Sequence, residues 1–120
     1  MIYRLICVIL AAALLGGCAT SIKSAYDSPD GKVLIVTKSD WAALQEYLGK
    51  VGSTHTGAFV VAIYGGKSDG WASSWCPGDV CYGGQDSANE AMNSCRKSGA
   101  RECVLFAHNQ RILVNYKRED

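Results

Sequence analysis

The sequence has no excess of charge of either sign, no apolar run long enough to span a membrane, and only two histidines. Its 12 lysine and arginine residues balance 11 aspartate and glutamate residues, whereas nucleic-acid-binding domains usually carry a basic face or tail. The longest apolar run, Leu5–Leu15, is well short of the ~20 residues of a transmembrane helix. Gly65-Gly66 and Gly83-Gly84 match neither a phosphate loop nor a dinucleotide-binding motif. We therefore expect no nucleic-acid partner and no nucleotide cofactor.

A catalytic constellation is also missing from the pattern. His55 and His108 are the only side chains whose unperturbed pKa lies near neutrality, and both fall in predicted turns. Asp69, Asp79 and Asp86 are scattered in predicted loops, where they resemble turn and cap residues more than a general acid and base. We expect a protein that is not an enzyme and that holds neither a metal nor another cofactor. A cysteine hydrolase using either histidine as its base is the enzymatic alternative.

The N-terminus has the order of an export signal. Arg4 precedes the apolar run, which has the length of a signal-peptide core, and small residues lead directly to Cys18. Leu15-Gly16-Gly17-Cys18 resembles the bacterial lipobox at all four positions. The resemblance implies cleavage before Cys18 and attachment of acyl chains such as palmitate to that residue. Because Ala19 is not the aspartate that retains lipoproteins on the inner membrane, it also implies the outer membrane, facing the periplasm, in a Gram-negative host.

Composition divides the chain into three parts. Residues 1–17 form the signal peptide, residues 18–31 form a polar tether that begins at the lipidated cysteine, and residues 32–120 form one domain. The mixed charges of Lys117–Asp120 predict a solvated tail. A chain of this length fits a single domain with one modest core.

The domain has the pattern of an α+β fold. A first helix is predicted from the N-cap Ser39 to the region of Gly49 and Gly52, and a second from a capping box of Ser87 and Glu90. Helical spacing predicts a common face for Trp41, Leu44, Leu48 and Val51, with Tyr47 beside them, and a buried face for Ala88, Ala91, Met92 and Cys95. The predicted strands are residues 32–37, 56–64, 71–75, 103–107 and 111–116. Residues 59–64 are apolar on both faces, which predicts a central strand. We expect an antiparallel sheet of about four to five strands with two helices packed on it, stabilised by disulfides.

Four cysteines remain after the signal peptide and the lipidated Cys18 are set aside. An even number in a small exported domain favours disulfides, and three pairings are open. The local pairing of Cys76 with Cys81 and of Cys95 with Cys103 is favoured, because Pro77-Gly78 lets the first loop close and Gly99 brings the chain back for the second. Zinc ligation is less favoured, because the intervals are longer than those of common zinc motifs.

From Gly57 onward the sequence resembles the DUF4189-type domain, a small exported bacterial module of unknown function. The resemblance lies in the segments 71–75 and 88–95, in Gly99 and Cys103, and in the strand pair around Ala107-His108-Asn109. It covers about half of the chain, and the segment between Cys76 and Cys81 departs from its pattern. It implies an exported α+β fold but no known active site.

The candidate binding surface centres on Trp71 and Trp75. Residues four apart in a strand share a face, so the two indoles lie either in the core or together on the surface, where they would offer a stacking platform for a glycan or a protein. Pro77, Asp79 and Tyr82 complete the candidate surface around a bridged loop. We expect a membrane-anchored envelope lipoprotein that binds an envelope protein or glycan without catalysis, for example an immunity or inhibitor protein. A peptidoglycan-acting hydrolase and a structural envelope component are the alternatives.

Overall fold

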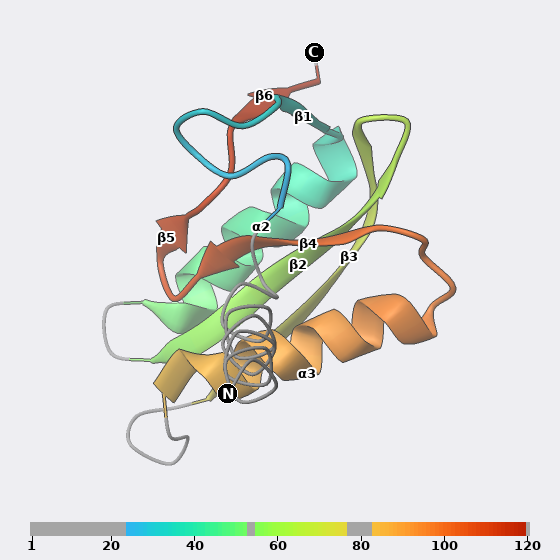
Figure 1. The fold of residues 1–120 in the computed structure, drawn as a ribbon. Coiled ribbons are helices and arrows are strands. Elements are labelled where there is room, and N and C mark those ends of the chain that lie inside the picture. Colours follow the sequence, from blue (N-terminus) through green and yellow to red (C-terminus); the bar gives the residue numbers. More distant parts are fainter. Residues whose placement is uncertain (1–23, 53–54, 77–82, 120) are drawn as a thin grey trace, which may run out of the picture.

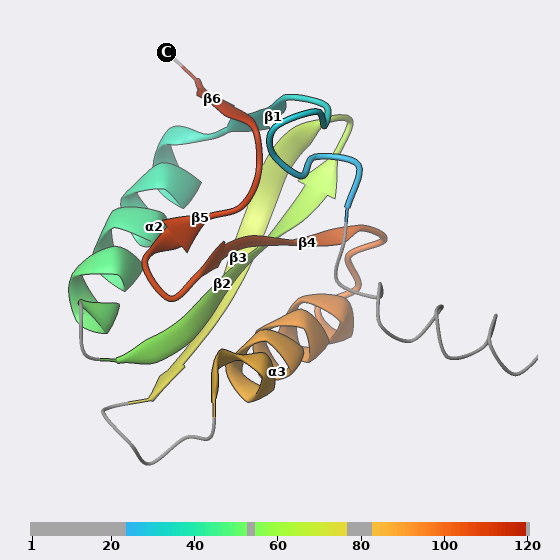
Figure 2. The same ribbon diagram turned by 60° about the vertical axis from the view of Figure 1, so that its left-hand side comes forward.

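The computed structural model describes residues 24–52, 55–76 and 83–119. Its elements follow the order β-α-β-β-α-β-β-β, and Figures 1 and 2 show the sheet lying between its two helices. In chain order they are β1 (Leu34–Val36), α2 (Lys38–Val51), β2 (Thr56–Tyr64), β3 (Lys67–Cys76), α3 (Gly83–Lys97), β4 (Cys103–His108), β5 (Arg111–Ile112) and β6 (Tyr116–Arg118). The α+β class with two helices on a sheet is thus confirmed.

The sheet differs from the predicted one in size and in strand direction. It has six strands in the order β5-β4-β2-β3-β1-β6, and β1 runs parallel to both of its neighbours, β3 and β6. The sheet is therefore mixed, whereas four to five antiparallel strands were predicted. The reason is the long-range course of the chain, which a local pattern does not encode. After β5 the chain crosses to the opposite edge of the sheet, where β6 pairs with β1.

The C-terminal segment corrects two further predictions. Residues 111–116 form not one strand but the two-residue β5, an isolated bridge from Val114 to Asp27 and the start of β6. Lys117 and Arg118 are exposed, as predicted, but they belong to β6 and pair with β1, so they are part of the sheet and not of a free tail. The Arg118 guanidinium lies 4.7 Å from the centre of the Trp41 ring, which helps to hold the strand on the domain.

Strand β2 is the centre of the sheet. It pairs in antiparallel fashion with β3 on one side and with β4 on the other, and residues 57–63 are all buried. A strand that has neighbours on both sides and a helix over each face needs apolar side chains on both faces. The continuous apolar run predicted this central position, and the structure confirms it.

Helix α2 begins earlier than predicted. Thr37 is its N-cap, and the Thr37 hydroxyl accepts a hydrogen bond from the backbone of Asp40, so Ser39 lies inside the first turn. The helix ends at Val51, where Gly52 adopts a positive φ of 52°. Leu44 and Val51 of the predicted face are buried against the sheet together with Tyr47, whereas Trp41 and Leu48 are only partly buried.

Helix α3 also begins earlier than predicted. Its backbone is helical from Gly83, so Ser87 is a buried residue of the helix and not its N-cap. The predicted capping box of Ser87 and Glu90 is therefore wrong, because the helix extends through a glycine- and polar-rich stretch that reads locally as a loop. The predicted buried face of Ala88, Ala91, Met92 and Cys95 is confirmed.

The end of the predicted tether packs on the domain. The phenol of Tyr26 is 7% exposed, the Ser28 backbone N–H donates to Leu113, and the Asn115 backbone N–H donates to Tyr26. Residues 24–31 are therefore part of the fold and not a free tether, since a buried tyrosine, backbone hydrogen bonds and the bridge from Asp27 to Val114 hold them on the domain. Residues 18–23 lie outside the described residues. In the described ranges, no helix combines the length and apolar character needed to cross a membrane.

Candidate functional site

The two tryptophans of β3 lie on the surface. Trp71 is 50% exposed and Trp75 is 41% exposed, so the surface alternative of the sequence analysis holds and the core alternative does not. Both residues stand opposite positions of β2 on the face covered by α2, since Trp71 pairs with the buried Val61 and Trp75 pairs with Gly57, where a Cβ atom would meet Val51 of the helix. The alternation of a strand places Ser73 on the same face between them.

Contacts with the core fix the position of each indole. The Trp71 ring stacks on the buried Phe59 ring, with centroids 5.6 Å apart and planes 13° apart. The Trp75 ring meets the edge of the His55 ring at 5.7 Å. Because each ring has one contact of this kind and is otherwise partly open, a partner would find two apolar surfaces already in place.

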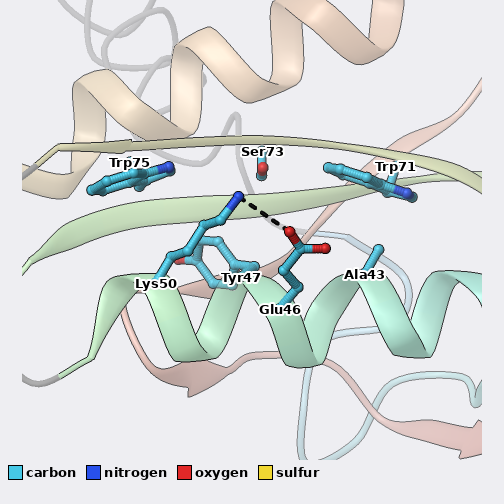
Figure 3. A pocket seen from close by; sticks show the side chains of 7 residues that line it. All are labelled: Ala43, Glu46, Tyr47, Lys50, Trp71, Ser73 and Trp75. Atoms are coloured by element: carbon cyan, nitrogen blue, oxygen red, sulfur yellow. Dashed lines mark ion pairs between the residues drawn. The ribbon is translucent and has the colours of Figure 1, made fainter.

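Helix α2 forms the other wall of this surface. Ala43, Glu46, Tyr47 and Lys50 of the helix line a shallow groove with Trp71, Ser73 and Trp75. Figure 3 shows Lys50 and Glu46 projecting between the two tryptophans, with the Lys50 ammonium 3.3 Å from the Glu46 carboxylate. We call these seven residues the tryptophan groove. It combines apolar rings with one charge of each sign.

The outer edge of β3 is open along this groove. Strand β1 pairs with β3 only where Ile35 faces Lys67, and no other described strand lies on that side. Gly57 uses both of its backbone groups on the β4 side, where it exchanges hydrogen bonds with Asn109. In an antiparallel ladder the residue opposite Gly57 must then point its own backbone groups away from β2. Trp75 therefore directs its N–H and C=O groups to the open edge. Because the direction of the backbone groups alternates along a strand with a period of two residues, Ser73 and Trp71 do the same.

A buried carboxylate fixes the start of this edge. Asp40 is 4% exposed, and its Oδ2 accepts hydrogen bonds from the Thr37 hydroxyl at 2.8 Å and from the Gly70 backbone at 3.3 Å. Gly70 has a positive φ of 108°, at an irregularity where two residues of β3, Asp69 and Gly70, lie opposite one residue of β2. The aspartate thus ties the N-terminus of α2 to the bulge that precedes Trp71.

The cysteines of the described residues are all bridged. Cys95 and Cys103 form the predicted disulfide, with Cα atoms 6.2 Å apart, and it links the end of α3 to the start of β4. Cys76 is also disulfide-bonded. Its predicted partner Cys81 lies outside the described residues, as do Pro77, Asp79, Tyr82 and Cys18. The predictions for those residues stay predictions.

The two histidines lie in different surroundings. His108 is the last residue of β4, opposite Ala58 and not in the predicted turn, and its Nε2 atom is buried without a hydrogen-bond partner. His55 packs against Trp75. Within the described ranges, no three histidine, cysteine, aspartate or glutamate side chains are placed to share a metal ion.

Tyr47 joins the groove to the β4–β5 turn. Its hydroxyl donates a hydrogen bond of 2.8 Å to the backbone oxygen of Asn109. Burial raises the pKa of the Tyr47 phenol far above its ordinary value, because the charged phenolate would lose its hydration. Tyr47 is therefore a neutral donor throughout the physiological range and not an acid–base group.

No family model, curated protein sequence or solved structure matches this chain. The resemblances to the lipobox and to the DUF4189-type domain thus stay predictions from the residues that carry them. Sequence reasoning found the two tryptophans but missed the open edge of β3 and the role of Asp40. The only local signal for the edge was the uncharged run 71–75, which reads equally well as an interior strand.

Proposed function

We propose that this chain is a lipid-anchored protein of the bacterial cell envelope that acts by binding a protein partner through the tryptophan groove and the adjoining edge of β3. The single observation that carries the proposal is the exposure of two preordered indoles beside unpaired strand backbone. Large aromatic side chains that are rigid and half exposed are the commonest anchors of protein interfaces. An immunity or inhibitor protein of the envelope is one form of such a module.

Several features favour binding over hydrolysis. A hydrolase needs a nucleophile, a base and donors for the developing charge in one place. Cys76, Cys95 and Cys103 are bridged, so none of them offers a thiolate. The tryptophan groove itself contains no histidine and only the paired carboxylate of Glu46. The open backbone of β3 favours a protein over a glycan, because it can form a strand ladder.

The lipid anchor is tested separately from the groove. Cys18→Ala in the full chain should leave an unprocessed precursor without lipid, seen by intact mass and by membrane fractionation. Wild-type protein that keeps Met1, carries no added lipid mass and is recovered in the soluble fraction would refute the anchor.

The groove is tested with the full chain crosslinked in its host membrane. Trp71→Ala with Trp75→Ala should abolish the crosslinked complexes of the wild type. Tyr64→Ala is the matched control, because it removes a still more exposed aromatic ring that lies outside the groove. Equal loss in both variants would contradict the proposed surface. A parallel digest of purified peptidoglycan addresses the alternative, and cleavage that disappears in His108→Ala would replace binding with hydrolysis.

A further inference from the structure

We propose that the outer edge of β3 pairs with the same edge of a second copy of this chain, in antiparallel orientation about Ser73, so that the two sheets become one. This inference rests on the proposed function, in that it takes the tryptophan groove as a binding surface, and it names one partner of that surface. Isologous pairing of this kind is the commonest way in which identical chains associate.

The outer edge of β3 lacks the features that usually prevent exposed strand edges from pairing with another chain. The true ends of the sheet are protected, because β5 has two residues including Arg111, and β6 has three residues including Lys117 and Arg118. Residues 71–75 read Trp-Ala-Ser-Ser-Trp, with neither charge nor proline. Proteins normally blunt an edge with charges, proline, shortness or a bulge. Here the only bulge lies before Trp71, so the edge beyond it is suited to pairing.

The direction of the backbone groups restricts the register. Trp71, Ser73 and Trp75 point their N–H and C=O groups outward, as derived above from the bonds of Gly57. Two copies can form a ladder only if outward residues face outward residues. Pairing about Ser73 satisfies this rule along the whole segment, because Ser73 then faces its equivalent and Trp71 faces the Trp75 of the second copy.

The side chains favour the same register. Each Trp71 would lie beside a Trp75 on the face covered by α2, and directly opposed aromatic pairs are among the favourable cross-strand contacts. Ala72, Ser73 and Ser74 are small enough for two strands to approach. The four indoles would fill the space between the two α2 helices, which is open in one copy (Figure 3).

The position of the tryptophans favours the antiparallel orientation over the parallel one. Antiparallel pairing about Ser73 keeps the α2 faces of both copies on the same side of the joined sheet, so the tryptophans can meet. Parallel pairing through the same edge would turn one sheet over and put the two pairs of tryptophans on opposite faces. In the antiparallel orientation the exposed Asp69 at the Trp71 end of one copy also lies toward Lys50 at the Trp75 end of the other, in addition to the contact of Lys50 with Glu46.

Cysteine crosslinking in the full, membrane-anchored chain tests the geometry. Residues facing each other in this ladder have Cα atoms about 5.5 Å apart, which is within the range of a disulfide. Ser73→Cys should therefore give a covalent dimer under mild oxidation. Ser94→Cys, an exposed serine on α3, is the matched control and should stay monomeric. Correct formation of the Cys95–Cys103 disulfide, checked by peptide mapping, shows that each variant is folded.

A mixed experiment fixes the register. Ala72→Cys in one tagged copy should crosslink to Ser74→Cys in a second, differently tagged copy, because these positions oppose each other, whereas Ala72→Cys alone should crosslink much less. Ser73→Cys protein that stays monomeric, or that crosslinks no better than Ser94→Cys, would overturn the dimer. If the dimer failed this test but complexes with another protein still depended on Trp71 and Trp75, the proposed function would stand without the dimer. If the tryptophan variants changed no complex at all, both would fail.

Discussion

The two faces of the sheet are filled by side chains of very different size. Beneath α2 the core is aromatic, with the Phe59 ring between those of Tyr47 and Phe106. Beneath α3 the central residues are alanines, including Ala58 of β2 and Ala91 of the helix, both fully buried. Small residues let a helix approach its sheet closely, whereas aromatic rings hold it further away.

The difference explains where the surface site lies. The aromatic layer under α2 continues outward from Phe59 to Trp71. The helix leaves the tryptophans at the edge of this layer, Trp71 and Trp75, about half exposed. Among the described residues the α3 face has no such aromatic extension, and it is closed at one end by the Cys95–Cys103 bridge. One face therefore serves mainly to hold the fold together, and the other also presents a rigid aromatic surface.

Removal of Phe59 should have the largest effect on stability. Its ring contacts Tyr47, Trp71 and Phe106 and is 1% exposed, so Phe59→Ala should lower the free energy of unfolding by about 3–5 kcal/mol. Val60→Ala, next to it but on the α3 face, removes less volume and should cost clearly less. Urea unfolding checks both. Equal losses would show that the two faces depend on packing to the same extent.

Loss of the disulfide should have the next largest effect. Cys95→Ala with Cys103→Ala opens a loop closed across eight positions, and the chain-entropy model predicts a loss of about 2–3 kcal/mol. Under reducing conditions, which also open the bridge of Cys76, the wild type and this double variant should unfold at nearly the same urea concentration. If the double variant matched the oxidised wild type, the α3 face would be held by packing alone.

Tyr47→Phe should have a smaller effect that depends on pH. Loss of the hydrogen bond to Asn109 should cost about 1 kcal/mol. The pKa of the Tyr47 phenol is raised in the folded state, so above the ordinary tyrosine value of about 10 the unfolded chain releases a proton that the folded chain keeps. Wild-type stability should therefore be full below that pH and fall above it.

The phenylalanine variant provides the control for this pH dependence. Because it lacks the titrating phenol, its free energy of unfolding should fall less steeply than that of the wild type as the pH rises above about 10. Parallel curves for the two proteins would show that the decline belongs to other groups. The difference between the curves thus isolates the contribution of one residue on the aromatic face.

Local chemistry was enough to predict part of this architecture. The apolar run of β2, the buried face of α3 and the Cys95–Cys103 pairing were predicted from periodicity, from the even number of cysteines and from their spacing, and the structure shows all three. Helix starts were less accurate, because Thr37 and Ser39 are equally good N-caps by type and only the fold chooses between them. The parallel pairing of β1 depends on contacts between distant segments.

The candidate site shows the same limit. The alternation of β3 puts Trp71 and Trp75 on one face, but it does not say whether a helix covers them. That outcome depends on the course of α2, which is tied to Gly70 by the buried Asp40. The open edge follows from β1 being only three residues long, so that it pairs with β3 only at Lys67. Neither the length of β1 nor the course of α2 can be predicted from the sequence of β3.

Lys50→Gln should have the smallest effect on the stability of the fold. Its ammonium and the Glu46 carboxylate form an ion pair one helical turn apart, with side chains 52% and 69% exposed, and such pairs contribute at most about 0.5 kcal/mol. The variant should unfold with nearly the wild-type free energy. Arg96→Gln, an exposed cation of the α3 face, is the matched control and should also be neutral.

The two variants should nevertheless differ in self-association. In the proposed dimer Lys50 lies toward the exposed Asp69 of the second copy, so Lys50→Gln should reduce the covalent dimer obtained with Ser73→Cys. The reduction should be larger at low salt than at high salt, because exposed charges are screened over a Debye length of about 10 Å at 0.1 M. Arg96→Gln should leave the yield unchanged at both salt concentrations. An equal response of the two variants would mean that charge does not orient the copies, and would leave the backbone register and the tryptophans to set the geometry alone.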